Sequence, residues 1–178
     1  MNPWRARRGL ALLAAALCAA TALAQHTPAF EITEARTEAA GFAITHDLLV
    51  RNLVHNCNPF SGSLSPTPEE ALAGWRQRNA ERLDAARGYM IYARTAIERR
   101  LGTVQAEDFY RKITGEFAQQ AKNMLQDIFS RAGPQPGVCG RWVAAIANRE
   151  ADLDGQPKYL PALDEILAFH KSVLAGAR

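Results

Sequence analysis

The sequence predicts an all-α protein, a single-domain bundle of four to five helices held together by one disulfide. Three observations lead to this fold class. Along most of the chain, apolar residues recur at steps of three and four, the spacing of one helix face. Short segments rich in glycine and proline separate these stretches, and no stretch alternates convincingly between apolar and polar residues as a half-buried strand would. Helical segments joined by short breakers are typical of a bundle.

The longest expected helix covers residues 67–102 and carries its own start and stop signals. Thr67 and Glu70 have the spacing of a capping box, in which each side chain bonds the backbone amide of the other residue. Gly102 can adopt the left-handed conformation that ends a helix. The apolar stripe of this helix requires partner helices, and it contains one polar residue, Asn79. Five large aromatic residues are expected in the core or at its boundary: Trp75, Tyr89, Tyr92, Tyr110 and Trp142.

Four further helices are expected, at residues 35–56, 103–131, 138–152 and from 158 or 161 to 175. Gly41 weakens the first of these helices, and residues 42–50 also fit a strand, although the helix is the preferred interpretation. Residues 57–66 are rich in proline, serine and glycine and predict a loop. Eight apolar residues define the expected buried face of the helix at 103–131: Phe109, Ile113, Phe117, Ala121, Met124, Leu125, Ile128 and Phe129.

Residues 1–24 have the pattern of a bacterial secretory signal peptide. Three arginines precede an apolar run of about 14 residues, and small residues precede Gln25. Cys18 suggests lipid attachment as an alternative, but Leu17 before it is bulkier than the residue that such processing prefers. We therefore expect residues 25–178 to form the mature domain, exported to the periplasm or secreted by a Gram-negative bacterium.

The charge of the chain is concentrated in this N-terminal segment. The formal net charge is +3, from 21 basic and 18 acidic residues. Three of the arginines and none of the acidic residues lie within residues 1–24, so the mature chain is near neutral. Its composition therefore predicts no nucleic-acid partner. No stretch after the signal peptide has the 18 or more apolar residues of a transmembrane helix.

Two cysteines remain in the mature chain, Cys57 and Cys139, and we expect them to form a disulfide in an oxidising compartment. The loop between them, about 80 residues, corresponds to about 4 to 4.5 kcal/mol in the chain-entropy model. A zinc site fits less well, since only His55 lies near Cys57, and a redox pair would usually be Cys-x-x-Cys. Successive antiparallel helices would also place the two cysteines at the same end of the bundle.

The histidines are the best candidates for a chemical site in this sequence. His46 and His170 lie on the apolar stripes of the first and last expected helices, where facing side chains could bind haem or a metal, and His55 is a possible third member. The preferred interpretation is that all three are structural. No familiar catalytic, phosphate-binding or haem-attachment motif occurs, and carboxylates are scattered singly. The sequence predicts no cofactor.

These observations leave three functional hypotheses. The first is a non-enzymatic interaction protein, of the inhibitor or immunity type, that binds a protein partner in the cell envelope. The second is a carrier of a small ligand, haem or metal that uses His46 and His170. The third is an enzyme whose site carries no familiar motif. Export, a disulfide-stapled scaffold and the missing catalytic set favour the first hypothesis.

Overall fold

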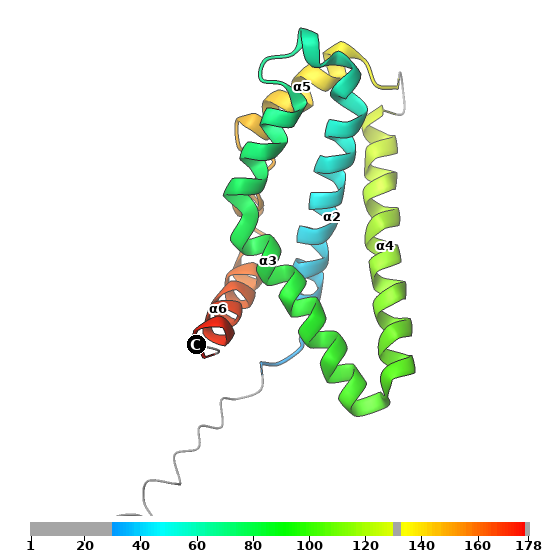
Figure 1. Cartoon of the computed structure of the whole chain (residues 1–178), viewed down its shortest axis with the longest axis vertical. Coiled ribbons are helices and arrows are strands. Elements are labelled where there is room, and N and C mark those ends of the chain that lie inside the picture. The colour runs from blue at the N-terminus through cyan, green and yellow to red at the C-terminus, as the bar shows by residue number, and fades with distance from the viewer. Residues whose placement is uncertain (1–29, 130–132, 177–178) are drawn as a thin grey trace, which may run out of the picture. The chain divides into compact units, whose positions relative to one another are not determined.

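The computed structural model describes residues 30–129 and 133–176 (Figure 1). All five helices of the described residues belong to one unit, Ile32–Arg178. Their bounds are α2 Glu34–Cys57, α3 Pro68–Leu101, α4 Thr103–Phe129, α5 Pro136–Ala147 and α6 Leu160–Gly176. Two short 3₁₀ helices, η2 Asn58–Ser63 and η3 Leu153–Gly155, complete the order of elements. The described residues contain no strand, so the predicted all-α class is confirmed. The expected signal peptide and Cys18 lie outside the described residues.

The sequence signals that define helix α3 act as expected. The Thr67 hydroxyl accepts from the Glu70 amide, and the Glu70 carboxylate accepts from the Thr67 amide at 2.9 Å. Gly102 has a φ of 96°, a conformation that residues with a Cβ rarely adopt, and it ends the helix. Residues 42–50 lie inside helix α2, which confirms the helical interpretation of that segment.

Two segments differ from the sequence prediction. The expected loop at residues 57–66 contains the 3₁₀ helix η2. Helix α5 ends at Ala147 instead of reaching residue 152. Arg149 there has a φ of 71°, and the Leu153 amide donates to the Asn79 side chain at 2.8 Å. Contacts with α3 therefore take the chain out of the helical path before Asp152.

Helices α2 and α3 form the centre of the bundle. Both pack against α4 and α6, which lie on opposite sides of this pair (Figure 1). Helix α5 also packs on both central helices. The largest fully buried side chains of α3 are Trp75, Tyr89 and Met90. The expected core positions of Trp75 and Tyr89 are therefore confirmed, whereas Leu101, at the end of the same apolar stripe, is 60% exposed.

A disulfide joins the C-terminal end of α2 to the first turn of α5. Cys57 and Cys139 are fully buried, and their Cα atoms are 5.4 Å apart. The pairing agrees with the prediction, and so does the contact between the first and fourth helices, since α2 packs against α5.

The expected buried face of α4 is only partly covered, which corrects the sequence prediction. Of its eight apolar residues, only Phe117 and Ala121 are buried. The other six are half-buried or exposed, and the Met124 residue is 37% exposed. The physical reason is the position of α4: its main helix partners are α2 and α3, both on the same side of it. The remainder of its apolar face borders a groove.

Candidate functional site

A groove of about 460 Å³ lies over helix α2, with α4 along one side. We call it the α2–α4 groove. Residues of α2, residues of α4 and one residue just before α6 line it: Thr37, Glu38, Gly41, Phe42, Thr45, His46, Ile113, Glu116, Phe117, Gln120, Met124 and Tyr159. Its lining combines apolar and aromatic side chains with a few polar groups, as binding sites in proteins commonly do.

Gly41 allows helix α4 to approach α2 closely. A Cβ built on Gly41 would lie 2.6 Å from Cε1 and 2.9 Å from Cζ of Phe117. The aromatic ring therefore occupies the space of the missing side chain. The glycine that weakens the helix prediction for α2 is the residue that seats Phe117 in the groove.

Aromatic stacking builds the second side of the groove. The Tyr159 ring stacks on Phe42, with centroids 4.2 Å apart and planes inclined by 14°. Phe42 also stacks on the His46 ring at 5.4 Å. The Lys158 ammonium lies 4.7 Å from the Tyr159 centroid and donates to Glu38 at 2.8 Å. The segment before α6 is thereby fixed against α2, opposite α4.

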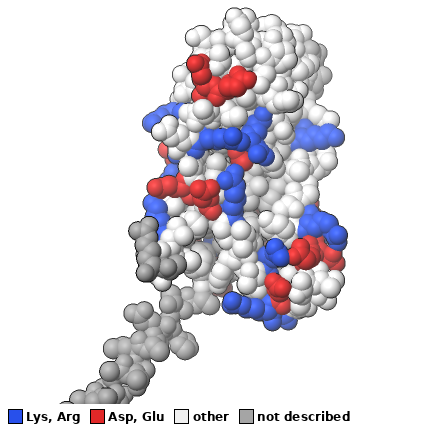
Figure 2. All heavy atoms as spheres, viewed as in Figure 1, with Lys and Arg blue, Asp and Glu red and all other residues white. Residues whose placement is uncertain are grey.

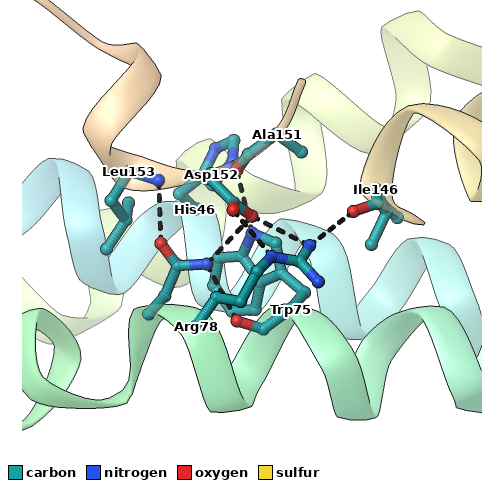
Figure 3. A network of polar contacts seen from close by, with 8 residues as sticks. His46, Trp75, Arg78, Ile146, Ala151, Asp152 and Leu153 are labelled. Carbon is teal, nitrogen blue, oxygen red and sulfur yellow. Dashed lines mark hydrogen bonds and ion pairs between the residues drawn. The ribbon is translucent and has the colours of Figure 1, made fainter. Parts of the chain in front are cut away.

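His46, one of the groove-lining residues, is held as a neutral imidazole, and Figure 3 shows its ring beside Ala151. Its Nε2 lies 2.8 Å from the Ala151 carbonyl, which also accepts a hydrogen bond from Trp75 Nε1. A carbonyl only accepts, so Nε2 carries the proton and Nδ1 is left as an acceptor. Burial lowers the pKa of His46, because desolvation of the charged form outweighs the bond to Ala151 and the charges of Asp152 and Asp47. The ring is therefore uncharged near neutral pH.

A buried polar network fixes the segment that holds His46 (Figure 3). Arg78 donates to Asp152 Oδ2 at 2.7 Å and to Oδ1 at 3.1 Å, and it also donates to the Ile146 carbonyl. Asn79 donates to Asp152 Oδ1 at 3.1 Å and accepts from the Leu153 amide. The polar residue in the apolar stripe of α3 is thus explained, since it satisfies buried groups after α5.

The charged residues that line the groove are both acidic, Glu38 and Glu116. Glu38 is bonded to Lys158, whereas Glu116 is exposed and has no ion-pair partner among the described residues. Thr45 lies in the same lining, 3% exposed, and its hydroxyl has no partner within the described part of the chain. The groove therefore favours a ligand that presents a positive charge or a hydrogen-bond donor beside an apolar group.

The three candidate histidines do not come together. His46 lies 5.9 Å from the Trp75 ring, whereas His170 packs against Gly88, where an added Cβ would be 2.9 Å from Nδ1. Trp75 and Gly88 are 13 residues apart on α3, which corresponds to about 20 Å along the helix. His55 is exposed. Within residues 30–129 and 133–176, no group of three or more His, Cys, Asp or Glu side chains is arranged to hold a metal.

A smaller cavity of about 300 Å³ lies between α2 and α3 and includes Asp47, Arg76, Asp84 and Arg87. Arg87 pairs with Asp47 at 3.0 Å and with Asp84 at 3.1 Å, whereas the buried Asp47 Oδ1 has no hydrogen-bond partner within the described part of the chain. Figure 2 shows acidic and basic residues interspersed on the face that it displays. Asp47, Asp84 and Arg87 of this cavity are ion-paired, and the cavity is smaller than the α2–α4 groove.

Sequence reasoning did not identify the groove, because its residues belong to three separate segments. Phe42 and Phe117 lie at helical spacings that predict core positions, and Tyr159 lies in an irregular segment. The only local signal was Gly41 inside a helix. Trp142, expected in or beside the core, is 36% exposed.

No family model, curated protein or solved structure matched this chain. Among its described helices, none combines the length and apolar character needed to cross a membrane.

Proposed function

We propose that this chain is an exported, non-enzymatic interaction protein whose α2–α4 groove binds a segment of a protein partner in the cell envelope. The observation that carries the proposal is an apolar groove bordered by an incompletely covered helix face, with carboxylates as its charged lining. The partner segment would place an apolar side chain against Phe42 and Phe117. A lysine or arginine beside it would meet Glu116, the carboxylate that has no ion-pair partner among the described residues.

The polar groups of the groove support binding better than catalysis. No hydrogen bond among the described lining residues joins a hydroxyl or a carboxylate to His46, whose Nε2 is taken by a backbone carbonyl. Nucleophilic catalysis requires a nucleophile paired with a base. The lining instead offers aromatic surface, which contributes strongly at protein interfaces.

The disulfide supports the exported location that the N-terminal sequence predicts. Disulfides persist in oxidising compartments such as the periplasm. The bond between Cys57 and Cys139 also ties helix α2, the floor of the groove, to the remainder of the bundle. A rigid groove loses less conformational entropy on binding than a flexible one, which suits an interaction or inhibitor protein.

The experiment that tests this proposal is photo-crosslinking in the producing bacterium. A photo-crosslinking amino acid replaces either Gln120 or Met124, two exposed residues of the groove lining. Matched controls carry it at Gln119 or Lys122, exposed residues of the same helix outside the lining. We expect a discrete crosslinked product from the two groove positions and a much weaker one from the controls.

Charge reversal gives the second arm of this experiment. When the photo-crosslinking amino acid is at position 120, adding Glu116→Lys should reduce the yield of crosslinked product about tenfold. A basic partner segment would then meet a like charge. Glu150→Lys, an exposed site outside the groove lining, should leave the yield within about twofold. Equal products from groove and control positions, or no product from any position, would contradict the proposal.

A small-ligand carrier is the alternative function. The volume of the groove lies within the range of small-molecule pockets, and neutral His46 offers an acceptor nitrogen beside it. The geometry supports a ligand held by His46 and the aromatic lining, not one shared with His170. Native mass spectrometry and an absorption spectrum of protein purified from the periplasm distinguish the two functions. A stoichiometric bound small molecule that His46→Gln removes would favour the carrier.

A further inference from the structure

Helices α3 and α4 form a long hairpin whose turn projects past the ends of α2 and α6 (Figure 1). We call residues 99–104 the hairpin tip. Gly102, with its φ of 96°, makes the turn between the two helices. All six residues of the tip are exposed.

The hairpin tip presents two large apolar side chains to solvent. Leu101 is 60% exposed and Val104 is 70% exposed. These two residues flank the turn itself, so the apolar surface lies at the most projecting part of the hairpin. No packing requirement of the bundle explains them, because neither side chain is buried against another helix.

Two arginines adjoin this apolar pair. Arg99 and Arg100 are exposed, and neither has an ion-pair partner among the described residues. The acidic residues that follow the turn are occupied: Glu107 pairs with Arg94, and Asp108 pairs with Arg111. Glu98 accepts a hydrogen bond from the Thr103 hydroxyl. Figure 2 shows acidic and basic atoms together in this lower region, and the unpaired arginines leave the tip with an excess of positive charge.

We propose that the hairpin tip binds the surface of a membrane that contains anionic phospholipids. Leu101 and Val104 would enter the boundary between headgroups and acyl chains, and Arg99 and Arg100 would bind lipid phosphates. Peripheral membrane binding combines these two contributions, apolar insertion and attraction of basic residues to anionic lipids. The near-neutral composition of the expected mature chain conceals this site, because an excess of acidic residues elsewhere in the chain offsets the two arginines.

The shape of the tip favours a lipid surface over a protein partner. A stable protein interface buries about 800 Å² on each partner. A projecting turn with two apolar residues offers far less than this to another folded protein. A bilayer can surround such a turn on all sides, so both side chains can leave water together.

Vesicle sedimentation of the full protein, as purified after export, tests the proposal. One set of vesicles contains phosphatidylcholine alone, and the other contains phosphatidylcholine with phosphatidylglycerol. Leu101→Ser/Val104→Ser removes the apolar pair, and Arg99→Gln/Arg100→Gln removes the charges. Ile91→Ser, on the same helix but away from the tip and 57% exposed in the native protein, is the matched control. All five residues lie at the surface, so the variants should fold.

The native protein should sediment with the anionic vesicles and remain in solution with the zwitterionic ones. Each double variant should lower the partition coefficient about tenfold, and the control should stay within about twofold of the native value. Higher salt should weaken the binding. Absence of the native protein from anionic vesicles, or native-like binding by both double variants, would overturn the proposal. Equal binding to both vesicle types would also overturn it.

Discussion

The ring of Phe117 on α4 lies where the side chain of residue 41 on α2 would otherwise be. A Cβ on Gly41 would come within 2.6 Å of ring atom Cε1. The two helices meet at this point, and the contact lies in the lining of the α2–α4 groove. The width of the groove therefore depends on a glycine.

Gly41→Ala should destabilise the protein by about 1–3 kcal/mol, because the new methyl group forces Phe117 out of its position. Gly115→Ala is the matched control, since nothing lies within 4 Å of an added Cβ there. As an exposed helical position, residue 115 should gain about 0.5–1 kcal/mol instead. Denaturant unfolding of both variants checks this prediction. Equal effects of the two substitutions would show that α4 does not pack on Gly41.

Asp152→Ala should cost about 2–4 kcal/mol of unfolding free energy. The change leaves the Arg78 guanidinium and the Asn79 amide without their buried acceptor. Asp154→Ala, two residues away at an exposed site, should change stability by less than about 0.5 kcal/mol. Thermal unfolding measured by circular dichroism is sufficient to compare them. Similar melting temperatures for the two variants would contradict the network described around Asp152.

The lowered pKa of His46 predicts a loss of stability on mild acidification. Below pH 6.5 the unfolded state takes up a proton at this residue, whereas the folded state resists protonation because the ring is desolvated. The unfolding free energy should therefore fall as the pH decreases from 6.5 toward the folded pKa and then level off. His46→Gln should remove this part of the pH dependence, and His55→Gln, at an exposed site, should retain it. An unchanged pH profile in the His46 variant would contradict the prediction.

Cys139→Ser should lower the unfolding free energy by about 2–5 kcal/mol, since it opens a loop with a sequence separation of 82 residues. Alkylation without reductant should leave Cys57 and Cys139 unlabelled in protein purified from the producing cells, and alkylation after reduction and unfolding should label both. Free thiols at Cys57 and Cys139 in that protein would exclude the disulfide under native conditions.

Much of the fold is determined by residues that are close together in the sequence, and for that reason the sequence predicts it. The capping box of Thr67 and Glu70 and the glycine at position 102 specify helix α3 within a few residues of chain. The cysteine pair could be assigned because only two cysteines follow the expected signal peptide. The end of α5 could not, because a partner on another helix determines it: Asn79 holds the Leu153 amide.

The groove illustrates what one sequence leaves open. Apolar periodicity identifies the face of α4, but it does not show how much of that face a neighbour covers. Met124 and Phe117 share the pattern, yet Phe117 is buried on Gly41 and Met124 lines an open surface. Likewise, the stripe positions of His46 and His170 suggested a facing pair, whereas their contacts on α3 place them far apart.

Sequencing of the partner peptide crosslinked through position 120 tests the central claim most directly. We predict a single segment of an envelope protein in which an apolar residue stands next to a lysine or arginine. The product should disappear with Glu116→Lys and persist with Glu150→Lys. A crosslinked segment that is acidic, or that also forms from position 122 on the outer face of α4, would contradict the assignment of the α2–α4 groove as the binding site.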